Sequence, residues 1–234
     1  MAQQPIQLYV SKLKMSRRTR KYDGRGRAEL AQLSRDAIIE VARGAFLARG
    51  YAETTIAQIA GDAGVSVETI YKGFGGKPGL VRAIYQRGLA GRGDKPARER
   101  SDAMSAREAD PRIILRNWGV LTAEVSPLAS PILLLVRSAA ITDPELADLL
   151  RESDDLRLAR MRQNAGVLAD RGFLRAGVTV ERAAELMWAY TSPDLYDLLV
   201  LRRSWTPEQL GEFVAGALTA ALLPVVRARA ARGP

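Results

Sequence analysis

Apolar residues recur at helical spacing along most of the chain, and no alternation of apolar and polar residues is long enough to predict a β-strand. The clearest pattern lies between Thr54 and Lys77, where Gly64 separates two short apolar stripes. The stripes consist of Ile56, Ile59, Ala60 and Ala63, and of Val67, Ile70, Tyr71 and Phe74. The pattern predicts an all-α protein with two short helices, joined by a tight turn, within residues 55–74.

Residues that favour helix ends delimit this pair. We expect Thr54 and Ser66 to be N-caps, because their side-chain oxygens can accept a hydrogen bond from a free N–H group of the first turn. Gly64 suits the left-handed conformation that often ends a helix. Two such helices can form a helix-turn-helix, whose second helix lies in the DNA major groove. The same geometry also occurs as ordinary packing in all-α proteins, so the spacing alone leaves both interpretations open.

Further helices are predicted on both sides of the pair. One that starts near Ala28 or Ser34 and ends at Gly50 would back the pair, and one over residues 78–89 would follow it. Residues 91–110 contain ten charged residues and predict a linker between domains. Beyond the linker, helix starts are marked by a cap residue before a proline, at Asp110, Ser126, Asp143, Ser192 and Thr206. The helices are expected near residues 111–125, 127–141, 144–171, 179–191, 193–203 and 207–227.

Positive charge is concentrated in the first part of the chain. The net charge of +9 divides into +10 over residues 1–100 and −1 over residues 101–234. Residues 1–27 form a basic arm with few large apolar side chains, a composition typical of a segment that is disordered when free. This charge predicts a polyanionic partner, and nucleic acid is the candidate beside a helix-turn-helix. The arm is expected to contact phosphates or a minor groove through Arg17, Arg18, Arg20, Lys21, Arg25 and Arg27. The alternatives are a solvated tail, or an upstream extension if translation starts at Met15.

The chain contains no cysteine and no histidine. Disulfides, thiolate or imidazole metal sites and Ser-His-Asp or Cys-His catalysis are therefore excluded, and we expect neither a metal nor another cofactor. No acid–base pair or nucleophile constellation favours an enzyme. No uncharged run reaches the length of a membrane span, and no secretory signal is evident. We therefore expect a cytoplasmic protein without a membrane partner, associated with the nucleoid when it is bound to DNA.

Several residues around the helix pair stand at fixed spacings. They are Gly50-Tyr51, Thr54-Thr55, Ile59-Ala60, Ala63-Gly64-Val65-Ser66, and then Tyr71, Phe74 and Lys77. This string, within residues 32–92, resembles the signature of the TetR family of bacterial transcriptional regulators. The resemblance implies a three-helix DNA-binding domain over residues 28–90 and a helical ligand-binding and dimerisation domain over residues 111–234. Two positions depart from the family pattern: Gly73 stands where a larger residue is usual, and Pro78 replaces the usual acidic residue.

Side chains of the pair that do not point inward are expected to face DNA. They are Thr55, Ser66, Val67, Glu68, Thr69, Tyr71 and Lys72. By resemblance, Thr69 and Tyr71 occupy positions that meet phosphates or base edges, and Lys77 matches the family's phosphate-anchoring lysine. Glu68 could accept a hydrogen bond from a cytosine amino group. Alternatively, it only stabilises the positive end of the helix dipole.

The end of the chain is predicted to carry an association surface. The last helix has a broad apolar stripe, and its other side carries small residues. Since two buried sides are hard to satisfy in one small domain, we expect a partner subunit, and members of the TetR family dimerise through their last two long helices. The expected interface contains Leu195, Leu199, Leu210, Phe213, Val214, Ala217, Leu218, Ala221 and Leu222. The alternative is an ordinary buried core helix.

A ligand pocket is implied by the resemblance and only weakly by individual residues. The side chains that could converge on it are Trp118, Met161, Met187, Trp188 and Tyr190. Flexible methionines and aromatic rings suit such pockets, but each could equally belong to the core. The lack of histidine, cysteine and lysine in this part favours a small, largely apolar effector.

Together these features predict a homodimeric, sequence-specific regulator. Its simplest mechanism is that of a repressor that leaves a palindromic operator when a ligand binds. The alternative is a sequence-nonspecific architectural DNA-binding protein that uses its basic arm.

Overall fold

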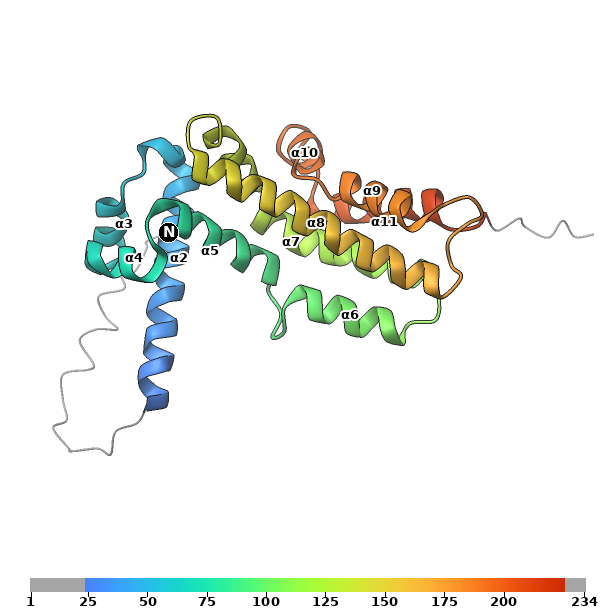
Figure 1. Ribbon diagram of the computed structural model, residues 1–234, viewed down its shortest axis with the longest axis horizontal. Coiled ribbons are helices and arrows are strands. Elements are labelled where there is room, and N and C mark those ends of the chain that lie inside the picture. The colour runs from blue at the N-terminus through green and yellow to red at the C-terminus, as the bar shows by residue number, and fades with distance from the viewer. Residues whose placement is uncertain (1–23, 226–234) are drawn as a thin grey trace, which may run out of the picture. The chain divides into compact units, whose positions relative to one another are not determined.

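The computed structural model describes residues 24–225, and the side chains of residues 29–225, as a set of helices without a strand among them (Figure 1). The prediction of an all-α protein is confirmed. In chain order the helices are α2 (Gly24–Glu53), α3 (Ile56–Ala63), α4 (Val67–Phe74), α5 (Lys77–Ala90), α6 (Ala97–Arg107), α7 (Pro111–Ala139), α8 (Pro144–Asp170), α9 (Val180–Tyr190), α10 (Pro193–Tyr196), the π-helix η2 (Asp197–Leu201) and α11 (Pro207–Leu222). Among the described residues, those up to Asp36 and those from Ala37 onward form two separate units.

One apolar core holds the helix pair α3–α4 in place. Phe46 of α2, Ile59 of α3, Ile70 of α4 and Leu80 of α5 are all inaccessible to solvent. The same core continues into α7, where Ile132 is equally buried. The helix pair therefore packs on the helices that follow it. The core of the helix pair continues past residues 91–110, where a boundary between two domains was expected. The division of roles between residues 28–90 and 111–234 remains a prediction.

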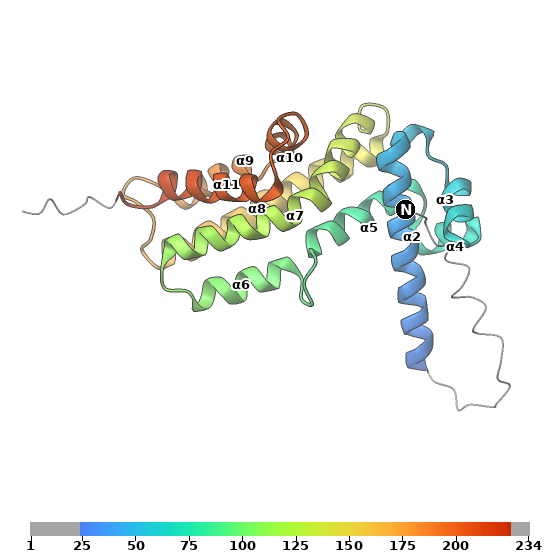
Figure 2. The same cartoon turned by 180° about the vertical axis from the view of Figure 1, so that it is seen from behind.

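A second core lies among α7, α8, α9 and α11, with Ile114, Leu168 and Met187 fully buried in it. α7 and α11 run side by side in both views (Figures 1 and 2). They touch at Gly119 and Gly211, because a Cβ atom added to either residue would lie 2.4 Å from the carbonyl oxygen of the other. By length and composition alone α7 could cross a membrane. Here it packs along α5, α8 and α11.

The charged segment 91–110 was expected to be a linker, but residues 97–107 form helix α6. Ser105 of α6 is buried, and its hydroxyl accepts a hydrogen bond from Trp118 Nε1 at 3.2 Å. Asp102 pairs with Arg160 of α8 at 2.7 Å. A charge-rich segment can be helical when its alanine, arginine and glutamate residues favour a helix and its small polar residues face a neighbour. Charge content alone was therefore a poor guide here.

A new helix was expected to start at Ser126-Pro127, but α7 continues through Pro127 and Pro131. A proline inside a helix removes the hydrogen bond to the carbonyl four residues earlier. The Pro127 carbonyl that Pro131 leaves free accepts a hydrogen bond from Arg43 Nη2 of α2 at 3.4 Å. Tertiary contacts of this kind, together with the burial of Ile132 and Leu133, keep the helix continuous.

The long helix α2 begins at Gly24, earlier than the predicted start at Ala28 or Ser34. Residues 28–33 contain only strong helix formers, which explains the extension. Arg25 and Arg27 of the predicted arm thus lie in the first turn of α2. The other basic residues of the arm, Arg17, Arg18, Arg20 and Lys21, lie outside the described residues. Near its other end α2 is interrupted at the predicted Gly50, whose φ is 82°.

The last helices also differ from their predicted bounds. Residues 193–203 were expected to form one helix, but they contain the single turn α10 followed by η2. α11 ends at Leu222 rather than near residue 227, because Pro224 cannot continue the helical hydrogen bonds.

Candidate nucleic-acid interface and ligand cavity

The turn between α3 and α4 is fixed by hydrogen bonds on both sides. Gly64 has φ 68° and ψ 30°, and its N–H donates to the carbonyls of Ala60 and Gly61. At the start of α4, Ser66 Oγ accepts the N–H of Thr69 at 3.1 Å. The predicted helix stop at Gly64 and the predicted cap at Ser66 are confirmed. Because Ile70 is also fully buried, the direction of α4 is set by the core as well as by the turn.

Thr54 was predicted to be the N-cap of α3, but the structure shows that Thr55 is the N-cap. Thr55 Oγ1 accepts the N–H of Gln58 at 3.2 Å, and Gln58 Oε1 accepts the N–H of Thr55 at 2.9 Å. The Thr54 side chain is buried instead, and its hydroxyl donates to the Gly50 carbonyl at 2.7 Å. Either threonine suits a cap by type. The need to satisfy the free carbonyl at the Gly50 corner decides between them.

The outer face of α4 is open to solvent. The predicted contact residues of α4 and its cap are all exposed, as is Thr55: Ser66, Val67, Glu68, Thr69, Tyr71 and Lys72. Val67 and Tyr71, which also belong to the second apolar stripe, are 41% and 55% exposed, in agreement with the predicted outward direction. In a helix of two turns only one narrow face can reach the core, and Ile70 and the half-buried Phe74 occupy it. An apolar and an aromatic side chain left exposed on a rigid helix are typical of a contact surface.

Lys77 stands at the first position of α5, beside the end of α2. Its Nζ lies 4.2 Å from the centroid of the Tyr51 ring, and it donates to the Ala52 carbonyl at 3.5 Å. Burial lowers the pKa of Lys77, while the charges of Asp143 and Glu53 oppose that change. The ammonium group is therefore held at the edge of the helix pair by the Tyr51 ring and the Ala52 carbonyl. Among the contacts of the described residues, it forms no ion pair.

Gly79 is a site residue that the sequence interpretation missed. A Cβ atom at Gly79 would lie 1.6 Å from the Phe74 carbonyl oxygen, so the first turn of α5 passes directly against the end of α4. Only glycine permits this approach. The available signal was a glycine in the first turn of a predicted helix, two residues after Lys77.

A cavity of about 400 Å³ lies among helices α5, α6, α7, α8, α9 and α11. Three of the five predicted pocket residues line it: Trp118, Met161 and Met187. The Trp118 ring is oriented by its hydrogen bond to Ser105 of α6. Tyr85 and Leu89 of α5 line the same cavity, so the helix that begins at Lys77 also reaches the ligand-sized space.

The other two predicted pocket residues, Trp188 and Tyr190, do not line this cavity. The Trp188 ring lies 5.3 Å from the guanidinium carbon of Arg157. Tyr190 packs edge-on against Phe213 of α11, with ring centroids 6.1 Å apart. Successive residues of a helix point about 100° apart, so Trp188 turns away from the cavity that Met187 lines, whereas Tyr190 is engaged by Phe213 of α11.

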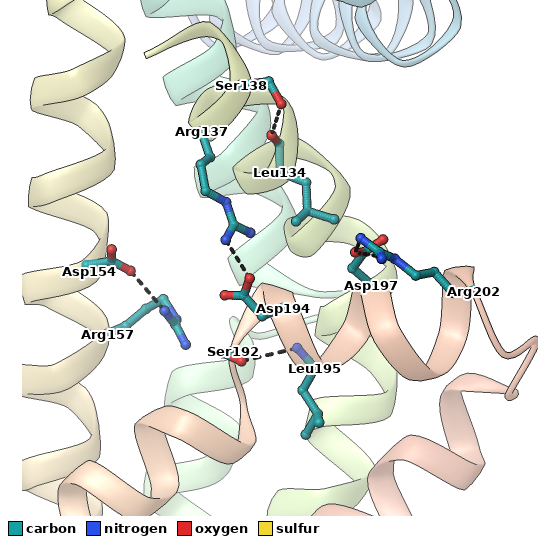
Figure 3. Close-up of polar contacts among 10 residues, drawn as sticks. All are labelled: Leu134, Arg137, Ser138, Asp154, Arg157, Ser192, Asp194, Leu195, Asp197 and Arg202. Atoms are coloured by element: carbon teal, nitrogen blue, oxygen red, sulfur yellow. Dashed lines mark hydrogen bonds and ion pairs between the residues drawn. The ribbon is translucent and has the colours of Figure 1, made fainter. Parts of the chain in front are cut away.

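The sequence interpretation also missed the polar part of the cavity lining. Arg157, Arg160 and Asn164 of α8 contribute to it together with Met161. Arg157 pairs with Asp154 at 3.0 Å, as Figure 3 shows, and donates to the Trp188 and Thr191 carbonyls. Both arginines are thus matched by acids, Arg160 by Asp102 of α6. The spacing of residues 157, 160, 161 and 164 on one helical face was the signal that could have found them.

Four of the nine residues predicted for subunit association are buried inside the chain's own second core. These are Leu210, Val214, Leu218 and Leu222, none more than 2% exposed. The apolar stripe of the last helix is therefore used against α7 and α9, and the small residues beside it permit the close contact with α7. Phe213 remains 39% exposed, and Ala217 and Ala221 are half-buried.

Leu195 and Leu199, also predicted for association, lie half-buried in α10 and η2. Ion pairs and a cap hold this segment (Figure 3). Asp194 binds Arg137 of α7, and Ser192 Oγ accepts the N–H of Leu195 at 3.2 Å. The neighbouring Leu198 and Leu201 are 50% and 52% exposed.

A rigid helix pair with an exposed second helix, followed by helices around a cavity, defines a helix-turn-helix regulator with a ligand-binding region. Residues 38–84 match the family described as bacterial regulatory proteins of the tetR family. The chain is also 32% identical over 199 residues to the probable HTH-type transcriptional regulator ArpR of Pseudomonas putida, which spans 76% of this chain and 90% of that protein. The chain belongs to the TetR family of bacterial transcriptional regulators.

Solved structures share this fold. The SmeT–triclosan complex has a TM-score of 0.65 and 21% identity, covering 83% of this chain and 93% of that one. A putative transcriptional regulator from Saccharomonospora viridis, in complex with choline, has a TM-score of 0.63 and 20% identity, covering 83% and 100%. The predicted family and TetR-like fold are therefore confirmed.

Proposed function

We propose that the protein is a sequence-specific, homodimeric repressor that binds a palindromic operator and leaves it when a small effector binds. The observation that carries the DNA-binding part is the exposed face of α4. Val67, Thr69 and Tyr71 stand open to solvent there on a helix whose direction is fixed by the buried Ile70 and by the Gly64 turn. A helix that is rigid and yet bears exposed apolar groups is suited to insert into a major groove.

Each exposed side chain of α4 has a contact that fits its chemistry. The Thr69 hydroxyl is engaged with Ser66 Oγ at 2.8 Å, so its methyl group is the part free to touch a thymine methyl. Glu68 can accept from a cytosine amino group, and Lys72 can bind phosphate. Lys77 needs only to exchange its long hydrogen bond with Ala52 for one with a phosphate oxygen. In this proposal the basic residues of the predicted arm, within residues 1–27, make further phosphate contacts.

The association surface in this proposal is smaller than the sequence suggested. It consists of the accessible residues of α10, η2 and α11, including Leu195, Leu199, Phe213, Ala217 and Ala221. Gly216 and Ala220 are exposed on α11 as well, and their small side chains would let a partner helix approach closely. A twofold dimer would present two α4 helices to successive major grooves, about 34–36 Å apart.

The effector in this proposal is small and largely apolar, and it occupies the cavity beside Trp118, Met161 and Met187. Arg157 and Arg160 are each engaged by an acid outside the lining, and serine and asparagine groups of the lining could orient one polar group of the ligand. The triclosan and choline complexes of the solved relatives support binding of a small molecule at this fold. Such a ligand can lower the affinity for the operator only by the factor by which it binds the DNA-free conformation more tightly than the DNA-bound one. We infer that the regulator acts in the cytoplasm.

Selection of DNA from a random pool tests the proposal. The purified protein is used at about 150–200 mM salt, where purely electrostatic binding is weak. We expect an enriched inverted repeat. Retention of DNA without an enriched motif would contradict the proposal and favour the architectural alternative.

A further inference from the structure

One carboxylate joins the start of α8 to the end of α2. The Tyr51 hydroxyl donates to Asp143 Oδ2 at 2.8 Å, across 92 positions of sequence. The other oxygen of the same group, Oδ1, accepts the N–H groups of Glu145 and Leu146 at 3.0 and 3.3 Å, as the N-cap of α8. Asp143 is therefore bound on one side by the backbone of α8 and on the other by Tyr51.

The Tyr51 ring is in turn the surface on which Lys77 rests. The ring stacks on the buried Phe46, with centroids 5.7 Å apart and planes at 23°. Lys77 Nζ lies 4.2 Å from the ring centroid. A cation is attracted to the face of an aromatic ring, and a hydroxyl that donates to a carboxylate makes that ring richer in electrons. Burial and the hydrogen bond to Asp143 both raise the pKa of Tyr51, so the hydroxyl keeps the proton that it donates.

We propose that Tyr51 and Asp143 are positioning residues for DNA binding. Their hydrogen bond holds the ring that supports Lys77, and it thereby ties the phosphate contact of Lys77 to α8. The inference rests on the proposed function, in which Lys77 binds a phosphate. α8 also lines the effector cavity through Met161 and Asn164. The hydrogen bond therefore links this cavity wall to the end of α2, in addition to the contacts of α8 with α5.

Two conservative substitutions test the inference. Tyr51→Phe removes one oxygen and keeps the ring on Phe46, while Asp143→Asn keeps a cap residue before Pro144. The matched control is Asp110→Asn, because Asp110 also precedes a proline and caps α7 by accepting the Arg112 N–H at 2.8 Å. Dissociation constants are measured by fluorescence anisotropy for the selected operator and for an unrelated duplex of equal length. Melting temperatures are recorded for every variant.

We expect Tyr51→Phe and Asp143→Asn to weaken binding to both duplexes by about three- to tenfold, which is within the range for loss of one ordinary hydrogen bond. Asp110→Asn should leave both dissociation constants unchanged. In a Lys77→Ala background, Tyr51→Phe should have no further effect, because the residue that the ring positions is gone. A purely structural role would lower the melting temperature without this dependence on Lys77.

Three results would overturn the inference while leaving the proposed function standing. The first is a Tyr51→Phe protein that binds DNA like the wild type although the Lys77→Ala protein binds more weakly. The second is that the effects of Tyr51→Phe and Asp143→Asn on the dissociation constant add when the two are combined. The third is an Asp110→Asn protein that binds DNA as weakly as the Asp143→Asn protein. Failure of the proposed function is recognised separately. If Lys77→Ala binds every duplex like the wild type, Lys77 makes no phosphate contact and the inference falls with it.

Discussion

Replacing Gly211 with alanine perturbs the close approach between α11 and α7. The added Cβ would lie 2.4 Å from the Gly119 carbonyl oxygen and 3.0 Å from Ala123 Cβ. Both neighbours belong to the rigid part of α7, so no flexible side chain can move aside. α11 must shift away from α7, which also moves Val214 and Leu218 at the cavity wall.

The size of the effect follows from two opposing contributions. Overpacking of a well-packed core costs about 1–3 kcal/mol. Alanine in place of glycine inside a helix returns about 0.5–1 kcal/mol. The net loss is up to about 2.5 kcal/mol, which corresponds to a fall in melting temperature of up to about 10 °C for a chain of this size.

Gly166 supplies the matched control. It lies inside α8, and a Cβ atom there would meet nothing within 4 Å. Gly166→Ala should therefore show only the helix gain of about 0.5–1 kcal/mol. Melting curves by circular dichroism, at one protein concentration for all variants, give the comparison. A Gly211→Ala protein as stable as Gly166→Ala would refute the close packing of α7 on α11.

Three further substitutions give specific results. Lys77→Ala should weaken binding to all DNA sequences alike and reduce the salt dependence of the binding constant by about one unit of slope, which titrations at several salt concentrations measure. Ser66→Ala removes the N-cap of α4 and should lower the free energy of unfolding by about 1 kcal/mol in urea melts, whereas an unchanged midpoint would contradict the capping geometry. Glu124→Gln removes the partner of Arg100, whose hydrogen bond is the main cause that lowers the pKa of Glu124. Because a lowered pKa stabilises the folded state above the ordinary value of 4.5, the variant should be less stable than the wild type near neutral pH. The difference should shrink as the pH falls below that value and vanish below the lowered pKa of Glu124, and a difference that is constant with pH would contradict the ion pair.

The helix pair could be predicted from sequence because its signals are local. Gly64 and Ser66 act through their own backbone conformation and through hydrogen bonds to residues three or four positions away. The choice between Thr54 and Thr55 was not local, since it depends on a carbonyl freed by the corner at Gly50. The continuation of α7 through Pro131 likewise depends on α2 and the core, which no local pattern records.

The C-terminal sites were predicted less well for a related reason. The spacing of Leu210, Val214 and Leu218 shows that one face is buried but does not say whether the same chain or a partner covers it. An aromatic residue such as Trp188 can face a cavity or a neighbouring helix with equal propensity. The place of Arg160 in the cavity lining could not be predicted, because its acid partner Asp102 lies on another helix.

The most direct test of the central claim is to repeat the DNA selection with a Glu68→Gln protein and compare its enriched motif with that of the wild type. If α4 reads bases in each subunit of a twofold dimer, the motif should change at one position in each half-site, symmetrically about the centre. Identical motifs from the two proteins would contradict a base contact by Glu68, and a change in only one half would contradict the symmetric dimer.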